Sequence, residues 1–173
     1  MPGAQQPYET IGGGAAPVFT DTGSAPVIYC NRVQFLVAGR VFGISYWYDT
    51  NDTGNHLGWL RKIGTGTVFV SKVFPRYVTA GVHASRWETK YITPALRVAA
   101  NDIFQVVMMH SFGHQSETVS PHSGDTDTVI GNFKLLADVA GTPNGSFSTS
   151  LAFTPSSSAG AAKYAVDVRF LPD

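Results

Sequence analysis

The sequence has little charge, a single cysteine and no long hydrophobic run. Of its 173 residues, 14% are charged, against about 25% in an average protein. The 12 basic and 12 acidic residues balance, and without a basic block the chain lacks the charge pattern of nucleic-acid-binding proteins. No window contains 18 consecutive apolar residues, so we expect no membrane insertion. Cys30 excludes an intrachain disulfide, and its apolar neighbours predict a buried small hydrophobe.

The common catalytic and targeting signals are also missing. There is no Gly-x-Ser-x-Gly nucleophile elbow, no phosphate-binding loop and no Gly-x-Gly-x-x-Gly after a predicted strand. No two of the acidic residues stand out as the opposed carboxylates that a glycosidase needs. We therefore expect a protein that is not an enzyme and has no cofactor. The first residues have neither a basic nor an apolar segment, so no secretory signal peptide is predicted.

Helical periodicity is weak, whereas short alternating or apolar segments are frequent. The best helical candidate, residues 94–100, is short and starts at a proline. The predicted strands cover residues 29–37, 41–48, 67–74, 87–93, 103–109, 147–153 and 164–170. Several short strands separated by Gly- and Pro-containing turns indicate an antiparallel sandwich or barrel.

Two segments fall outside this strand pattern. Residues 1–17 are rich in Gly, Ala, Pro and Gln and predict an extended N-terminal arm, with the β-domain spanning residues 18–173. An arm of this composition cannot form a core of its own, so we expect it to pack on another chain, as exchanged arms do in symmetric assemblies. Residues 111–127 form the longest polar stretch and are predicted to be a loop held by contacts.

One stretch of sequence is distinctive. Its strand and loop read Gly43-Ile44-Ser45-Tyr46-Trp47, then Asn51-Asp52-Thr53-Gly54-Asn55-His56-Leu57-Gly58, and later segments in the same order are Gly66-Thr67-Val68-Phe69, Trp87, Pro94, His110 and Tyr164 to Phe170. The order and spacing resemble a bacterial domain family of unknown function that occurs in secreted and surface proteins. The resemblance implies a jelly-roll type of β-sandwich that binds rather than catalyses, with His56 holding the backbone of its loop. Arg61 and Ala165 stand where the family has tryptophans.

Aromatic residues carry the strongest binding signal. Trp47, Trp59 and Trp87 either form a stacking platform for sugar rings or pack in the core, where aromatic side chains bury large areas. Neighbouring residues on a strand face opposite sides, so core-facing Tyr46 and Tyr48 would put Trp47 on the outer face. An outward tryptophan there suits either a ligand or a subunit contact. We also name His56, His114 and His122 as candidate contacts.

Two sets of residues contain side chains of the types that bind metals. Asp49, Asn51 and Asp52 precede Gly54 and resemble the start of a calcium loop, but Leu60 stands where such a loop has its last carboxylate. Asx and Gly residues also build plain turns, which is the prediction here. The other set is His110, His114, His122, Asp125 and Asp127. His110 ends a predicted strand and His114 lies in a loop, so their spacing of four does not define a site, and we expect no bound metal.

The absence of a secretion signal in a chain that resembles an extracellular family favours one setting. Phage particles leave the cell by lysis, so their exposed proteins need no signal peptide. We therefore expect a structural or attachment protein of a bacteriophage virion, either a minor tail protein or a capsid decoration, made in the host cytoplasm. Its expected partners are neighbouring virion proteins, symmetry copies of itself in a homo-oligomer, and a host-surface glycan. The alternative is a carbohydrate-binding or adhesion module of a bacterial surface or secreted protein.

Overall fold

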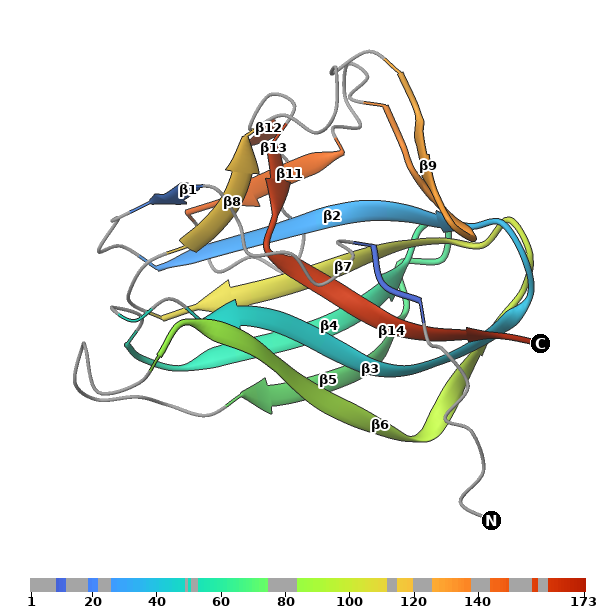
Figure 1. Cartoon of the computed structure of the whole chain (residues 1–173), viewed down its shortest axis with the longest axis horizontal. Helices are drawn as coiled ribbons and strands as arrows, with labels where there is room; N and C mark the ends of the chain where they lie inside the picture. The colour runs from blue at the N-terminus through green and yellow to red at the C-terminus, as the bar shows by residue number, and fades with distance from the viewer. Residues whose placement is uncertain are drawn as a thin grey trace.

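The chain folds into antiparallel sheets that pack against each other. The structure, a computed structural model, describes residues 9–11, 19–21, 26–48, 50, 53–74, 84–111, 115–119, 126–137, 144–149, 157–158 and 162–173. Across these ranges it contains strands and turns but no helix, so the predicted all-β sandwich is confirmed. Figure 1 shows the strands of one layer drawn across those of the other.

The larger layer is an eight-stranded sheet, called here the large sheet. Its main path follows β12 (Ser157–Ser158), β11 (Gly145–Ser148), β2 (Val27–Phe35), β7 (Ile103–His110), β4 (His56–Lys62) and β5 (Val68–Phe74). The remaining strands are β10 (Phe133–Leu135), which pairs with β2, and β9 (Thr128–Ile130), which pairs with β10. Strands distant in sequence thus lie side by side, with β7 inserted between β2 and β4.

The opposite layer, called here the β3 sheet, has three strands. They follow the order β14 (Val166–Pro172), β3 (Gly39–Tyr48) and β6 (Arg86–Val98). The hydrophobic core lies between this sheet and the large sheet, and Phe35 of β2 contacts Phe170 of β14 across it, with ring centroids 5.0 Å apart. Strand alternation decides which side chains enter the core, because every second residue of β3 from Ile44 to Tyr48 is fully buried.

A third, small sheet joins segments that lie almost entirely outside the predicted strands. It consists of β1 (Phe19–Asp21), β8 (Gln115–Val119) and β13 (Ala162–Tyr164), with β8 in the middle. The expectation that residues 111–127 are entirely loop is therefore wrong for Gln115–Val119. The reason is tertiary, because β8 pairs with two strands that are remote in sequence.

Two further assignments need correction. Residues 94–98 of the helical candidate belong to β6, whose Leu96 and Arg97 are register partners of Val41 and Arg40 in β3. His56 to Gly58, given as the end of a loop, and the unassigned residues 59–62 together form the strand β4 in the large sheet. Gly58 makes the sequence of β4 less typical of a strand. Close packing explains why a glycine stands there, because a Cβ would lie 2.9 Å from Cε2 of Phe74 and 3.2 Å from Cε of Met108.

Part of the predicted arm belongs to the sandwich itself. Glu9 forms an antiparallel bridge with Phe170 of β14, and its backbone N–H and carbonyl both bond to that residue. Ile11 is fully buried, and its N–H donates to Oδ1 of Asp167 at 2.7 Å. The expected contact with another chain therefore does not apply to residues 9–11. The other residues of the predicted arm lie outside the described ranges.

Candidate functional site

The structure brings two of the predicted contact residues together on the outer face of the β3 sheet. Trp47 of β3 and Trp87 of β6 are register partners, and their rings meet edge to face with centroids 5.8 Å apart. Ile44, Tyr46 and Tyr48 are fully buried in the core, whereas Trp47 and Trp87 are partly exposed. The outward orientation predicted for Trp47 agrees with this burial pattern.

A second aromatic pair lies on the same face, farther along the strands. The rings of Phe42 and Tyr91 are nearly parallel, with an interplanar angle of 8° and centroids 6.4 Å apart. Tyr91 is 66% exposed, which is high for so large an aromatic side chain. Because Trp87 and Tyr91 are four residues apart on one strand, the two aromatic pairs are separated by about 13 Å.

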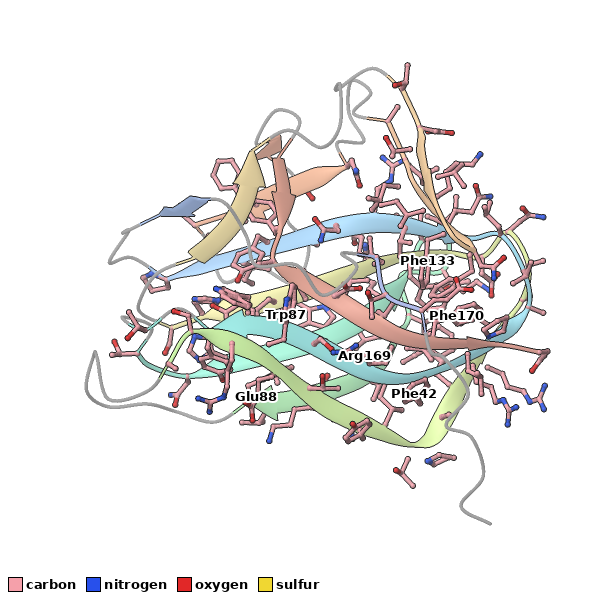
Figure 2. All side chains as sticks on the ribbon, viewed as in Figure 1. Phe42, Trp87, Glu88, Phe133, Arg169 and Phe170 are labelled. Carbon is pink, nitrogen blue, oxygen red and sulfur yellow. The ribbon has the colours of Figure 1, made fainter. Side chains whose placement is uncertain are left out.

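Polar side chains occupy the space between the aromatic pairs. The hydroxyls of Ser45 and Thr89 are hydrogen-bonded at 2.8 Å, and Nε of Arg169 donates to Oγ of Ser45 at 3.1 Å. Gly43 makes room for this group, because a Cβ there would lie 3.0 Å from Cγ2 of Thr89 and 3.2 Å from Cγ of Arg169. Figure 2 shows Trp87 and Phe42 at different ends of the sheet, with Arg169 between them.

We call this surface the outer-face strip. Its members are Trp47 and Trp87 at one end, Phe42 and Tyr91 at the other, and Ser45, Thr89 and Arg169 between them. The strip combines flat apolar rings with the partly exposed Thr89 hydroxyl and Arg169 guanidinium, while Ser45 beneath them is 1% exposed. Such a combination recognises a ligand that is itself apolar on one side and polar at its edges. Sequence alternation pointed to Trp47, but the rest of the strip depends on pairing between β3, β6 and β14.

The third tryptophan is not part of this surface. Trp59 of β4 is 1% exposed and packs with Ile28, Cys30 and Val107 in a second hydrophobic cluster. The prediction that Trp59 contacts a ligand or a subunit is therefore wrong for the folded chain. The sequence could not reveal this, because the burial comes from side chains of β2 and β7.

His56 is likewise a core residue. It begins β4, is 1% exposed and is the register partner of His110 in β7, with ring centroids 4.4 Å apart. Nε2 of His110 is hydrogen-bonded to the hydroxyl of Tyr29 at 2.7 Å, and the rings of Tyr46 and Tyr48 contact His56. The interpretation of His56 as a ligand or subunit contact is corrected: its ring lies inside the aromatic core.

The remaining predicted residues are placed as follows. His114, His122, Asp125 and the calcium candidates Asp49, Asn51 and Asp52 lie outside the described ranges. Asp127 accepts a hydrogen bond from the Ala137 N–H, and its carboxylate lies 3.2 Å from Nζ of Lys134; these contacts lower its pKa. No group of three or more His, Cys, Asp or Glu side chains that suits a metal occurs in the described ranges.

The single cysteine behaves as a small hydrophobe. Cys30 is fully buried, and its Sγ lies 3.0 Å from Oγ of Ser146. Burial raises the pKa of the thiol to about 11, because the charged thiolate would lose its hydration. A thiol with so little thiolate at neutral pH is a poor nucleophile, which agrees with the sequence interpretation.

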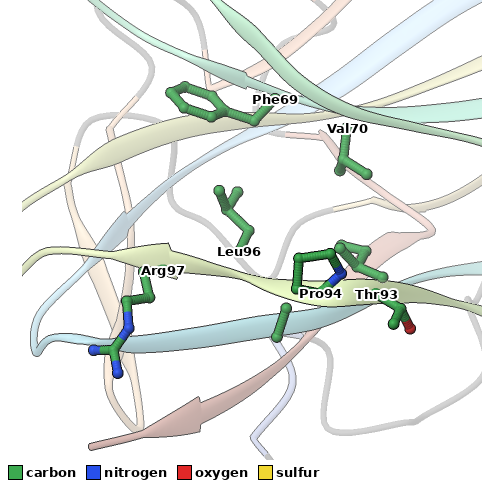
Figure 3. A pocket seen from close by; sticks show the side chains of 8 residues that line it. Phe69, Val70, Thr93, Pro94, Leu96 and Arg97 are labelled. Atoms are coloured by element: carbon green, nitrogen blue, oxygen red, sulfur yellow. The ribbon is translucent and has the colours of Figure 1, made fainter.

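A groove of about 470 Å³ lies between the two edge strands β5 and β6. Figure 3 shows Phe69 and Val70 of β5 facing Pro94 and Leu96 of β6 across it. Its complete lining is Phe69, Val70, Ile92, Thr93, Pro94, Ala95, Leu96 and Arg97. The lining is mostly apolar and includes no carboxylate, imidazole or thiol, so it has no residue for acid–base chemistry and no base that would activate the Thr93 hydroxyl.

The described residues include no helix that is long and apolar enough to cross a membrane. No protein-family model matches this chain, and no curated protein matches it.

Proposed function

We propose that this chain is a non-enzymatic attachment protein that binds a glycan through the outer-face strip. One observation carries the proposal: on one sheet face, two partly exposed aromatic pairs flank the partly exposed Thr89 and Arg169, which are both hydrogen-bonded to the buried Ser45. A sugar ring has an apolar face that stacks on aromatic rings and hydroxyls at its edge that need hydrogen-bond partners. The strip offers both kinds of contact.

The contacts of the carboxylates support a role in binding rather than hydrolysis. Those with described side chains are held by other groups: Glu9 by Asn132, Glu88 by Arg86, Asp102 by Lys62, Asp127 by Lys134, Asp167 by backbone N–H groups, and Asp173 by Arg40 and Arg97. Glycoside hydrolysis requires two opposed carboxylates beside the sugar. Asp167 shares the face of the strip and is 2% exposed, whereas Glu88, between Trp87 and Thr89 on β6, is the register partner of the core-facing Tyr46 and points to the other face.

The proposed setting is the surface of a bacteriophage particle. There, the ligand of a minor tail protein or capsid decoration would be a glycan of the host surface. In the alternative setting, a bacterial surface or secreted protein, the same strip would serve adhesion. The proposal includes the jelly-roll type of sandwich that the family resemblance implies.

The test compares strip variants with a surface variant elsewhere. Trp87→Ala and Tyr91→Ala each remove a ring from the strip, and Val73→Ala removes an exposed apolar group from β5, where Val73 is 72% exposed. Binding of the purified proteins to a glycan array and the melting temperature of each are measured. We expect the strip variants to bind at least about tenfold more weakly, or about 1.4 kcal/mol, with Val73→Ala unchanged.

Two outcomes would contradict the proposal. One is that the wild-type protein binds no glycan on the array. The other is that the strip variants bind as well as Val73→Ala does. Trp47→Ala adds a check on orientation: a loss of more than about 3 kcal/mol of stability would make Trp47 a core residue.

A further inference from the structure

β6 is the last strand of the β3 sheet, and one of its edges is open among the residues that the structure describes. On one side β6 pairs with β3, and no described strand pairs with its other side. Figure 1 shows β6 beside β3 at the margin of the sandwich. The regular pairing runs from Arg86 to Tyr91, after which the register with β3 shifts and Pro94, which has no N–H, follows. An added strand can therefore pair regularly only with residues 86–91.

The hydrogen bonds of β3 determine which backbone groups face this open edge. The Trp47 N–H donates to the carbonyl of Ala165, just before β14, so the backbone groups of Trp47 point away from β6. Along an antiparallel strand this direction alternates from one residue to the next. Ser45 therefore also points away from β6, and its register partner Thr89 turns its own N–H and C=O to the open edge. The same holds for Tyr91, two residues farther along.

Two side chains of opposite charge flank Thr89 in the sequence of β6. Glu88 is the register partner of the core-facing Tyr46, and Lys90, two residues on, shares its face; both are partly buried. Arg86 contacts Glu88 within the strand, whereas no described residue pairs with Lys90. Charges on the inner side of an edge strand disfavour an apolar partner strand, which would bury them without counter-charges. An occupant of this edge must therefore supply an anion opposite Lys90 and a cation opposite Glu88.

We infer that β6 pairs with β6 of a second copy of this chain, antiparallel and centred on Thr89. In this register Glu88 of each copy lies opposite Lys90 of the other, so that both charges find a partner. The two Thr89 residues exchange N–H···O=C hydrogen bonds, which matches the direction of their backbone groups. Registers centred one residue earlier or later would place Glu88 against Glu88 or Lys90 against Lys90, which repulsion disfavours. The inference does not depend on the proposed function.

The same register continues the outer-face strip from one copy to the other. Trp87 of each copy lies opposite Tyr91 of the other on the outer face, and such aromatic cross-strand pairs stabilise antiparallel sheets. The contact covers part of Tyr91, which is 66% exposed in the single chain. A two-fold axis through the Thr89 pair makes the interface self-complementary, as in most soluble dimers.

The experiment measures self-association and reverses one charge at a time. Sedimentation velocity between about 1 µM and 500 µM should show a monomer–dimer equilibrium for the wild-type protein. Lys90→Glu leaves only carboxylates at the paired positions, and Glu88→Lys leaves only ammonium groups. Each variant alone should dimerise at least about tenfold more weakly, because like charges then face each other. Both side chains point away from the outer-face strip, so no residue of the strip is changed.

Mixing the two variants tests the register. In a heterodimer every carboxylate of the Lys90→Glu chain lies opposite an ammonium group of the Glu88→Lys chain, so the equimolar mixture should dimerise about as tightly as wild type. Raising NaCl from about 50 mM to 500 mM should weaken the wild-type dimer and the heterodimer, because salt screens charge pairs. Lys72→Glu is the matched control, since it reverses a partly buried lysine on β5, the edge strand of the large sheet. It should dimerise as wild type does.

Melting temperatures show which variants are folded, and the outcomes are then decisive. The inference is wrong if the wild-type protein stays monomeric over the whole concentration range. It is also wrong if folded Lys90→Glu dimerises as wild type does, if Lys72→Glu weakens the dimer equally, or if the two folded charge variants form no heterodimer. If Glu88→Lys does not fold, the comparison of Lys90→Glu with Lys72→Glu decides. A monomer that binds glycans would leave the proposed function intact.

Discussion

Gly58 shows how one missing side chain permits the two layers to approach. It lies on the core face of β4, where an added Cβ would meet Phe74, Met108 and Ile44 at 2.9, 3.2 and 3.3 Å. Ile44 belongs to the opposite sheet, so a side chain at Gly58 would push against both layers. The surrounding core is closely packed, and overpacking of such sites forces side chains out of their preferred rotamers.

We predict that Gly58→Ala lowers the free energy of unfolding by about 1–3 kcal/mol. In a domain of this size, each kcal/mol corresponds to roughly 2–4 °C in melting temperature. Thermal and urea denaturation measure the effect, with Ser71→Ala on the exposed side of the neighbouring strand as the control. A Gly58→Ala protein as stable as Ser71→Ala would show that the layers have room for a methyl group.

The ion pair between Lys62 and Asp102 makes the stability of the fold depend on pH. Nζ of Lys62 lies 2.6 Å from Oδ1 of Asp102, and the Ala99 N–H donates to Oδ2. Partial burial raises the pKa of Asp102, but the hydrogen bonds from Lys62 and Ala99 and the charge of Lys62 outweigh it, so the net pKa is lowered. A carboxyl whose pKa is lower in the folded protein than in the unfolded chain stabilises the fold at pH values above its unfolded pKa. It loses this contribution as the pH falls through its folded pKa.

We therefore predict that Asp102→Asn costs about 1 kcal/mol at pH 7, and that the difference from wild type shrinks below about pH 4. Urea denaturation between pH 7 and pH 3 measures both proteins. A difference that stays constant down to pH 3 would contradict the role assigned to the charge of Asp102.

Sequence reasoning at the residue scale succeeded where strand alternation was regular. It placed Trp47 on the outer face because Ile44, Tyr46 and Tyr48 alternate with it, and the burial of those three residues agrees. It failed for Trp59 and His56, whose strand is interrupted by Gly58. Their environments depend on packing partners in β2, β3 and β7, and no local pattern contains that information.

At the scale of elements, the N-terminal segment 9–11 ties the two layers together. It pairs with the edge of β14 in the β3 sheet, while the Glu9 carboxylate reaches the turn between β9 and β10 of the large sheet. Oε2 accepts from the backbone N–H of Asn132 at 2.9 Å, and Oε1 accepts from its side-chain Nδ2 at 2.7 Å. Gly131 leaves space for this carboxylate, since its Cβ would lie 2.9 Å from Oε2.

We predict that Glu9→Ala lowers the free energy of unfolding by about 1.5–3 kcal/mol, because hydrogen bonds to a charged group are stronger than neutral ones. Asn132→Ala removes the side-chain donor from the other end of the contact. In a double-mutant cycle measured by urea denaturation, the two changes should be non-additive. Thr10→Ala serves as the neighbouring control, and fully additive effects would show that the contact does not connect the layers.

Elements that depend on long-range pairing were the ones that sequence reasoning missed. The strand β8 is polar, and it exists through pairing with β1 and β13 at opposite ends of the chain. β6 continues through residues 94–98 because β3 supplies its register, although the local sequence starts with a proline. By contrast, β2, β3, β5 and β7 have apolar or alternating sequences of their own and were predicted with shifts at their ends.

At the scale of the whole molecule, Cys30 reports on the integrity of the large sheet. It lies on β2 between β11 and β7, fully buried, so a reagent reaches its thiol only when these strands separate. We predict that Cys30 does not react with a thiol reagent in the native protein at pH 8. In urea, labelling should follow the same time course as unfolding monitored by tryptophan fluorescence. Complete labelling within seconds in native buffer would contradict this.

The fold class followed from features that are spread over the whole chain. Weak helical periodicity, frequent Gly and Pro, and several short apolar segments indicate a β-sandwich regardless of which strand pairs with which. The outer-face strip could not be predicted in the same way, because it combines three strands whose order in the sheet is not their order in the sequence. Only Trp47 and Trp87 among its members were named in advance.

The alternation of inward- and outward-facing side chains along β3 also affects how the sequence can change without loss of the fold. Its residues from Phe42 to Tyr48 serve two separate surfaces, with Ile44, Tyr46 and Tyr48 facing the core and Trp47 facing the strip. Substitutions at Trp47, Trp87, Thr89 and Tyr91 can therefore change the proposed binding surface while the interior keeps its shape. If the strip binds a glycan as proposed, selection from a library randomised at these four positions would yield new specificities on an unaltered scaffold.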